Sequence, residues 1–432
     1  MTIHVVQPGE TIDSISALYN ITAERLVLEN GILNPDNLVV GQTIVIVQPE
    51  LVYVIQDGDT LASIAEENDV SVMELLRNNP YLSNRQYLFP GETIVIRYET
   101  NKIRSIATSG YAFPYIDIDV LTKTLPFLTY LTIFNYNITR EGEIIVDDED
   151  SDIVQLAKIY GVAPMMFVST FTQEGISSGE VAFNILNNPQ IQDQLIENIL
   201  TILKTKGYYG INFYAEYITL ENIDQTAVYL KRAADILHAQ GYRVLITVTP
   251  EIKIDSQKVR FNTIDYSKLA VSVDAIVFTS YEWGRSYSFP SSINPVNVMR
   301  ELLNYAVKIV PPEKIFVGLI TIGYDWQLPY VPGASTANAI TSDGAIQIAA
   351  ENGVAIQFNE PAQAPYFYYM DGEEQLHIIW FKDARTFDAF ARLVLEYGLQ
   401  GLSIWTIMYF NTQMWFVLNT EYDIDKVTDI TI

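Results

Sequence analysis

Apolar and polar residues alternate in blocks along the last three-quarters of the chain, and these blocks predict strands and helices in turn. Short apolar runs typical of buried parallel strands occur at residues 103–113, 128–138, 163–171, 210–217, 242–250, 275–284, 315–326 and 401–409. Helical spacing of apolar residues lies between most of them, most clearly at 188–206, 221–240, 294–310 and 383–397. Eight strands joined by crossover helices over roughly 330 residues predict an α/β fold, a (β/α)8 TIM barrel at 102–432.

Residues 341–382 interrupt this alternation. The segments VAIQFN, FYYMD and LHIIWF in this range have the composition of additional strands. We therefore predict a small α+β insertion after the seventh strand, in which His377 is an ordinary strand residue. A doubly wound open sheet is the alternative architecture, but no Gly-x-Gly-x-x-Gly follows the first strand, so a dinucleotide site has no support.

The first hundred residues contain a different pattern, which occurs twice. Residues 5–31 align with residues 54–80, and GQTIVI at 41–46 aligns with GETIVI at 91–96. Each copy predicts a strand, two short helices and a closing strand, with Thr11 or Thr60 as the N-cap of the first helix. Two small α+β modules are therefore expected at residues 1–48 and 49–98.

The two copies resemble LysM modules, a family that binds glycans containing N-acetylglucosamine, such as peptidoglycan and chitin. The resemblance implies that the glycan is bound by loop residues Gly9, Glu10, Thr11, Asn34 and Asp36 of the first copy and Gly58, Asp59, Thr60 and Asn84 of the second. Gly, Asn and Asp are also the usual residues of turns, so a purely structural role is the alternative for each of them.

Composition narrows the possible partners. The formal charge of −26 argues against nucleic acid and against an anionic membrane surface, because binding to phosphates needs clustered Lys and Arg. No apolar run approaches the roughly 20 residues of a membrane span, and the N-terminal sequence does not look like a signal peptide. The chain has no Cys and only three His, without ligand spacing, so neither a metal nor a cofactor is predicted. Its 28 Tyr and 5 Trp favour a neutral sugar as ligand.

Candidate chemistry lies at the carboxyl ends of the predicted strands, where barrel enzymes carry their sites. Glu216 follows the fourth strand, and a partly desolvated carboxyl can protonate a leaving oxygen because its pKa is raised. Aromatic and acidic residues follow other strands: Tyr136, Tyr281, Glu282, Trp283, Tyr324, Trp326 and Trp405. This set predicts sugar hydrolysis, and the alternative is that the aromatic residues only close the barrel.

Residues 102 to about 425 resemble glycoside hydrolase family 18, and within it the LysM-bearing N-acetylglucosaminidases that degrade spore cortex peptidoglycan. The strand-four signature of that family, Asp-x-x-Asp-x-Asp-x-Glu, falls on Tyr209, Asn212, Tyr214 and Glu216. The resemblance implies a substrate-assisted retaining mechanism. In it Glu216 protonates the glycosidic oxygen, the substrate's N-acetyl oxygen attacks the anomeric carbon, Tyr281 binds the acetamido group and Trp405 forms the floor of the subsite. It also implies an association with the spore coat, the cortex or the cell wall.

Tyr214 departs from the family pattern at the Asp that orients the acetamido group. A phenol is neutral near pH 7, and losing such an electrostatic contact could cost on the order of 10² to 10³ in rate. Glu282 could partly substitute for this Asp. Two functions therefore stay open: a peptidoglycan glycosidase, and a non-catalytic glycan-binding or spore-structural protein. A metal-dependent hydrolase ranks third, because no residues show metal-ligand spacing.

Overall fold

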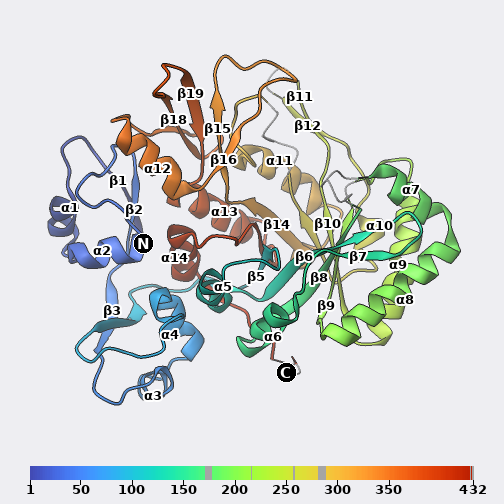
Figure 1. The fold of residues 1–432 in the computed structure, drawn as a ribbon, viewed down its shortest axis with the longest axis horizontal. Helices are drawn as coiled ribbons and strands as arrows, with labels where there is room; N and C mark the ends of the chain where they lie inside the picture. The colour runs from blue at the N-terminus through green and yellow to red at the C-terminus, as the bar shows by residue number, and fades with distance from the viewer. Residues whose placement is uncertain (171–177, 216, 256–257, 281–288, 429, 431–432) are drawn as a thin grey trace.

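The computed structural model describes residues 1–170, 178–215, 217–255, 258–280, 289–428 and 430. Its main feature is a closed barrel of eight parallel strands (Figure 1): β5 (Arg104–Ala112), β6 (Tyr130–Ile138), β8 (Ala163–Ser169), β9 (Gly210–Ala215), β10 (Arg243–Val248), β13 (Ala275–Phe278), β14 (Ile315–Ile320) and β20 (Gly401–Trp405). Each strand pairs with the next in this order, and β20 pairs with β5 to close the cylinder. The predicted barrel is confirmed.

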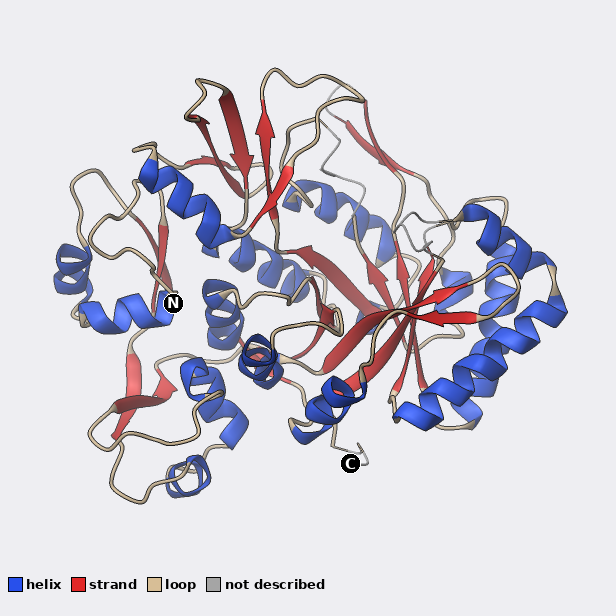
Figure 2. Ribbon diagram, viewed as in Figure 1, coloured by secondary structure: helices blue, strands red, loops and turns tan. Residues whose placement is uncertain are grey.

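Helices surround the barrel on its outside (Figure 2). They are α5 (Ile118–Thr124), α6 (Ser151–Ile159), α7 (Gly179–Asn187), α8 (Pro189–Lys206), α9 (Ile223–Ala239), α10 (Ser267–Ala270), α11 (Val296–Ala306), α13 (Ala384–Glu396) and α14 (Thr412–Glu421). Short strands flank the sheet or extend its loops: β7 (Ile144–Val146), β11 (Ile252–Asp255), β12 (Lys258–Phe261) and β21 (Tyr422–Ile424). None of the helices that the structure describes is long and apolar enough to cross a membrane.

Helix α8 shows how local sequence positions the fourth strand. It begins after Asn188, whose side chain accepts hydrogen bonds from two backbone N–H groups of the first turn, and it ends at Gly207 with φ 74°. Strand β9 follows at once and pairs in register with β8 and β10. At its first residue, Gly210, a Cβ would lie only 2.3 Å from the carbonyl oxygen of Arg243, so the close approach of the strands requires glycine.

The insertion is a five-stranded antiparallel sheet with one helix. Its strand order is β16 (Asn338–Ile340), β15 (Gly323–Gln327), β19 (Leu376–Trp380), β18 (Ala364–Met370) and β17 (Gln357–Asn359). Helix α12 (Ser342–Glu351) packs on one face of this sheet through Ala345 and Ala349. The sheet begins at Gly323, earlier than the predicted 341, because the predicted strand 315–326 is two strands. Pairing of β14 with β20 ends at Ile320, and β15 then pairs antiparallel with β16 and β19.

The two N-terminal modules have the predicted order of elements. Module 1 contains β1 (Thr2–Val5), α1 (Ile12–Tyr19), α2 (Ala23–Asn30) and β2 (Thr43–Ile46), and module 2 contains β3 (Pro49–Val54), α3 (Leu61–Glu67), α4 (Val72–Asn78) and β4 (Thr93–Tyr98). Thr11 and Thr60 cap α1 and α3 with reciprocal Ser bonds, as predicted. Both modules lie against the same side of the barrel, where α14 contacts α2 and α4 (Figure 1).

Candidate active site

A ring of three hydrogen bonds lies inside the barrel below the end of β9. Thr247 Oγ1 donates to Asn212 Oδ1 at 2.9 Å, and Asn212 Nδ2 donates to the Tyr111 hydroxyl at 3.0 Å. The Tyr111 hydroxyl, 2.8 Å from Thr247 Oγ1, then closes the ring as a donor. All three side chains are buried. Burying an amide whose oxygen and nitrogen both form hydrogen bonds costs less free energy than burying a carboxylate, which would need a counter-charge. This explains why Asn212 stands where the strand-four signature has Asp.

Aromatic rings from four strands form a continuous wall beside this ring of hydrogen bonds. Trp405, half-buried at the end of β20, has its ring centroid 5.5 Å from that of Tyr111 and 5.7 Å from that of Phe134. Phe134 stacks on Phe167 at 5.0 Å, and Phe167 lies 5.6 Å from Tyr214. The wall therefore runs from β20 through β6 and β8 to β9. Such a surface can receive the apolar face of a sugar ring.

Tyr214 is the last member of this wall, two residues before Glu216. Its side chain is half-buried, and its hydroxyl lies 3.5 Å from Thr249 Oγ1 at the end of β10. The phenol therefore presents an aromatic face and a polar tip at the position of the family's third Asp. Glu216 itself, together with Tyr281, Glu282 and Trp283, lies outside the described residues, so the roles predicted for these four remain predictions.

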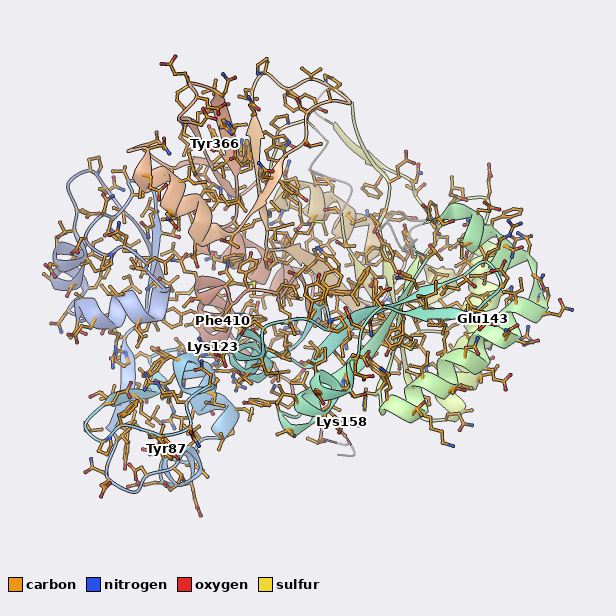
Figure 3. The ribbon with its side chains drawn as sticks, in the orientation of Figure 1. Tyr87, Lys123, Glu143, Lys158, Tyr366 and Phe410 are labelled. Atoms are coloured by element: carbon orange, nitrogen blue, oxygen red, sulfur yellow. The ribbon has the colours of Figure 1, made fainter. Side chains whose placement is uncertain are left out.

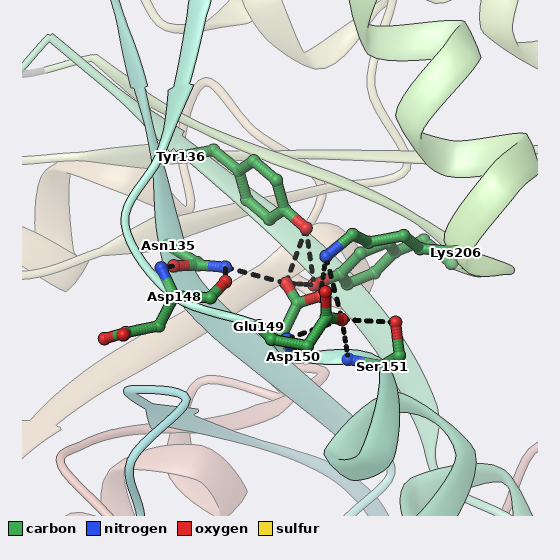
Figure 4. Close-up of polar contacts among 8 residues, drawn as sticks. Asn135, Tyr136, Asp148, Glu149, Asp150, Ser151 and Lys206 are labelled. Atoms are coloured by element: carbon green, nitrogen blue, oxygen red, sulfur yellow. Dashed lines mark hydrogen bonds and ion pairs between the residues drawn. The ribbon is translucent and has the colours of Figure 1, made fainter.

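Tyr136 does not face the barrel interior, and the prediction that it contacts substrate is wrong. The pairing of β6 with β8 shifts between Phe134 and Tyr136, so one extra residue occupies this part of β6. Regular alternation would place both rings on one face, but the bulge turns Phe134 inward and Tyr136 toward the helices. Tyr136 is fully buried there, with its hydroxyl 2.5 Å from Asp150 Oδ2 (Figure 4).

Asp150 gathers a buried network on the outside of the barrel (Figure 4). Its carboxylate accepts from the hydroxyls of Tyr136 and Tyr208, from Asn135 Nδ2 and from Lys206 Nζ at 2.6 Å. Burial alone would raise the pKa of Asp150, but these donors hold that pKa below its ordinary value. The network joins the loop before α6 to the end of α8. Its role is to hold the barrel wall, and it contributes no group to the interior.

Tyr324 and Trp326 both lie in the inserted sheet, and their rings are 5.4 Å apart. Trp326 is completely buried, so the prediction of a sugar contact for its ring is not supported. Tyr324 is half-buried and lies opposite Trp380 on β19. Trp380 in turn stacks at 4.5 Å on Tyr366 of β18, which is labelled in Figure 3. Tyr324 is thus partly exposed among aromatic neighbours, and its predicted contact with substrate stays a prediction.

The predicted glycan-binding residues of the modules divide into two groups. Glu10 and Asp59 each accept a hydrogen bond from the backbone N–H three residues earlier and so close the first turn. Thr11 and Thr60 are helix caps, and Gly9 and Gly58 have φ of 85° and 90°. Their structural role is therefore clear. Asn34, Asp36 and Asn84 are exposed in the later loops and remain candidates for glycan contact.

Other residues of the interior are not evident from the sequence. Tyr111 and Thr247 are the last-but-one residues of β5 and β10, and Phe167 lies inside β8. Only the packing and register of neighbouring strands bring these three residues to Asn212. Their apolar or hydroxyl side chains look like ordinary strand residues in the sequence. Among the residues that the structure describes, no group of three His, Asp or Glu side chains could hold a metal ion.

Comparison with known proteins gives consistent matches over the whole chain. The model of glycosyl hydrolases family 18 matches residues 111–409, and the LysM domain matches residues 4–47 and 53–97. The cortical fragment-lytic enzyme of Bacillus subtilis is 30% identical over 434 aligned residues, which cover 99% of this chain and 100% of that protein. The crystal structure of the spore cortex-lytic enzyme SleL of Bacillus megaterium has a TM-score of 0.81 and 30% identity, covering 98% of each chain. SleL of Bacillus cereus has a TM-score of 0.80 and 29% identity, covering 99% of each.

Proposed function

Because the chain belongs to glycosyl hydrolases family 18 and carries two LysM domains, we propose that it cleaves the peptidoglycan of the bacterial spore cortex at N-acetylglucosamine. The observation that carries this proposal is the similarity over the whole length to the cortical fragment-lytic enzyme, modules and barrel in the same order. The modules hold the glycan, and the barrel hydrolyses it. The protein therefore acts at the spore cortex or cell wall.

The reaction we propose uses one carboxyl group of the protein and the amide of the substrate. Glu216 gives its proton to the glycosidic oxygen. At the same time the N-acetyl carbonyl oxygen of the N-acetylglucosamine that is cleaved attacks the anomeric carbon of that sugar. The glycosidic bond breaks and an oxazolinium ion forms. Water then attacks the anomeric carbon on the face opposite the N-acetyl oxygen, and the Glu216 carboxylate takes a proton from that water. The bond between the anomeric carbon and the N-acetyl oxygen breaks and the amide is restored, so the configuration is retained.

The described interior supports this chemistry in two ways. The hydrogen-bond ring of Asn212, Tyr111 and Thr247 ties β9 to β5 and β10 four residues before Glu216. The wall of Trp405, Phe134 and their neighbours excludes water from one side of the sugar. Tyr214, which is neutral, cannot stabilise the developing positive charge as the family Asp does, so turnover should be slower than in relatives that keep this Asp.

Hydrolysis of cortex fragments tests the proposal. Wild-type protein should release new reducing ends from fragments that contain muramic-δ-lactam, and Glu216→Gln should lower the rate on the order of 10² to 10⁴-fold, because the proton donor is lost. Glu221→Gln, which changes an exposed carboxylate in the same segment, should keep the wild-type rate. Equal rates for Glu216→Gln and the wild type would contradict the assigned acid. Glycan binding without release by the wild type would leave only the non-catalytic binding function.

A further inference from the structure

A cavity of about 360 Å³ lies between module 1 and the inserted domain, and neither forms it alone. One wall is the loop between α2 and β2, including Leu33, Asn34 and Asn37. The opposite wall is helix α12, with Ile346 and Gln347. The loop thus faces a surface that belongs to the inserted domain.

The walls of this cavity are held in place by contacts across the domain boundary. Val39 packs into the core between α12 and the inserted sheet. The backbone N–H of Ile356 donates to the Val40 carbonyl at 2.9 Å, and Arg385 Nη2 donates to the Gly41 carbonyl at 3.3 Å. At the floor, Gln413 Nε2 donates to the carbonyl of Thr43 at 2.6 Å. The cavity is therefore preformed, and a ligand would not need to bring the domains together.

The lining has the chemistry of a site for a neutral sugar. Leu33, with 73% of its surface exposed, and the half-buried Ile346 supply apolar surface. The exposed amides of Asn34 and Gln347 can hydrogen-bond hydroxyl and acetamido groups. Asp343 and Glu351 on α12, also in the lining, repel anionic ligands.

The lining also contains a lysine, Lys382, but its charge does not favour an anion. Lys382 is buried, and its ammonium group donates to the carbonyls of Ile293 (2.5 Å) and Asn294 (3.3 Å). The ammonium is therefore directed to the loop that follows β13. A phosphate or a carboxylate in the cavity would lie near the carboxylates of α12. Among the described lining residues, no cation is available to compensate the repulsion.

We propose that this cavity is an additional glycan-contact site, in which an N-acetylglucosamine chain held by module 1 also touches helix α12. The inference rests on the proposed glycan binding of the modules and adds the inserted domain as part of the binding surface. A glycan bound there contacts module 1 and the inserted domain at once. The inserted domain therefore contributes to the affinity and to the direction in which the glycan leaves the module. The later loop of module 2 differs, since it exposes Tyr87 and Phe89 (70% and 61%).

Calorimetric titration of the full-length protein with an N-acetylglucosamine pentasaccharide tests the proposal. Ala350→Trp fills the cavity from α12, and Gln347→Ala removes one amide without adding bulk. Both should weaken binding, the former by about tenfold or more and the latter by about fivefold, as expected for one lost hydrogen bond. Gln225→Ala, a control at an exposed helical position of α9, should bind like the wild type.

The outcomes separate this inference from the proposed function. Weaker binding in both α12 variants, with unchanged unfolding midpoints, supports the site. Unchanged binding by Gln347→Ala and by Ala350→Trp overturns it and leaves glycan binding by the modules intact. If the wild type does not bind the pentasaccharide, both this site and the glycan-binding part of the proposed function are wrong.

Discussion

In each LysM module a buried asparagine ties the second helix to the closing strand, and the two asparagines share three hydrogen bonds within their modules. Each Oδ1 also accepts one bond that the other module lacks, from Gln413 Nε2 at Asn30 and from the Tyr81 hydroxyl at Asn79. Asn30 of module 1 donates from Nδ2 to the carbonyls of Leu26 and Val45 and accepts at Oδ1 from the Val45 N–H. Asn79 of module 2 makes the same three bonds with Leu75 and Val95. The repeated sequence therefore builds the same interior twice.

The outer surfaces of the modules differ at the turn before the closing strand. Gly41 and Gly91 occupy equivalent turns, with φ of 89° and 90°. A Cβ on Gly41 would lie 2.1 Å from the Ile356 carbonyl oxygen of the inserted domain, whereas a Cβ on Gly91 would have nothing within 4 Å. The same turn is thus packed against the insertion in module 1 and open to solvent in module 2. Equivalent sequence positions therefore carry different constraints.

The largest expected effect is the loss of either buried asparagine. Asn30→Ala and Asn79→Ala each leave a buried backbone N–H and carbonyl without their partners, so each should lower the free energy of unfolding by about 2–4 kcal/mol. Denaturant unfolding of the full-length protein measures the change, and Asn37→Ala at an exposed loop position is the control. A clearly smaller loss at one module would show that the interiors are not energetically equivalent.

The two glycines offer a sharper comparison. Gly91→Ala should cost about 1–2 kcal/mol, because alanine is strained at positive φ. Gly41→Ala carries the same strain and must also displace the Ile356 carbonyl, so it should cost about 1 kcal/mol more. The difference between the two losses of unfolding free energy isolates the contact between module 1 and the inserted domain. Equal losses would mean that module 1 moves away from the insertion without cost.

The smallest expected effect concerns pH. Glu29 of module 1 is buried, with a side chain only 8% exposed, and burial raises its pKa to about 7 although Tyr98 donates to it at 2.9 Å. The folded protein then holds a proton between about pH 4.5 and 7 that the unfolded chain releases, so the unfolding free energy falls as pH rises through this window. The equivalent residue of module 2 is the neutral Asn78.

Replacing Glu29 by Gln should therefore remove part of this pH dependence and make module 1 resemble module 2. The loss of stability from pH 4.5 to 7 should be smaller than in the wild type by roughly 1–2 kcal/mol. Glu24→Gln, on the exposed side of the same helix, should leave the slope unchanged. An unchanged slope in Glu29→Gln would show that this carboxyl does not keep its proton in the folded state.

Much of the fold can be predicted from local patterns, and the candidate site only in part. The strand runs, the Asn188 and Gly207 ends of α8 and the Thr11 and Thr60 caps depend on residues within one or two turns of each other, so the sequence shows them directly. Trp405 at a strand end is found in the same way. Tyr136 is misplaced because a one-residue bulge reverses the direction of its side chain, and no local signal marks that bulge.

The sequence by itself determined the repeated module, the order of barrel strands and the place of Glu216 after the fourth strand, because apolar periodicity and cap residues act over short stretches of chain. Only the tertiary structure decided what surrounds equivalent positions. Gly41 meets Ile356, Asn212 meets Tyr111, and the loop at Asn34 faces α12 because segments more than a hundred residues apart pack together. Such contacts depend on which surfaces meet, and one chain read in order contains no pattern that specifies them.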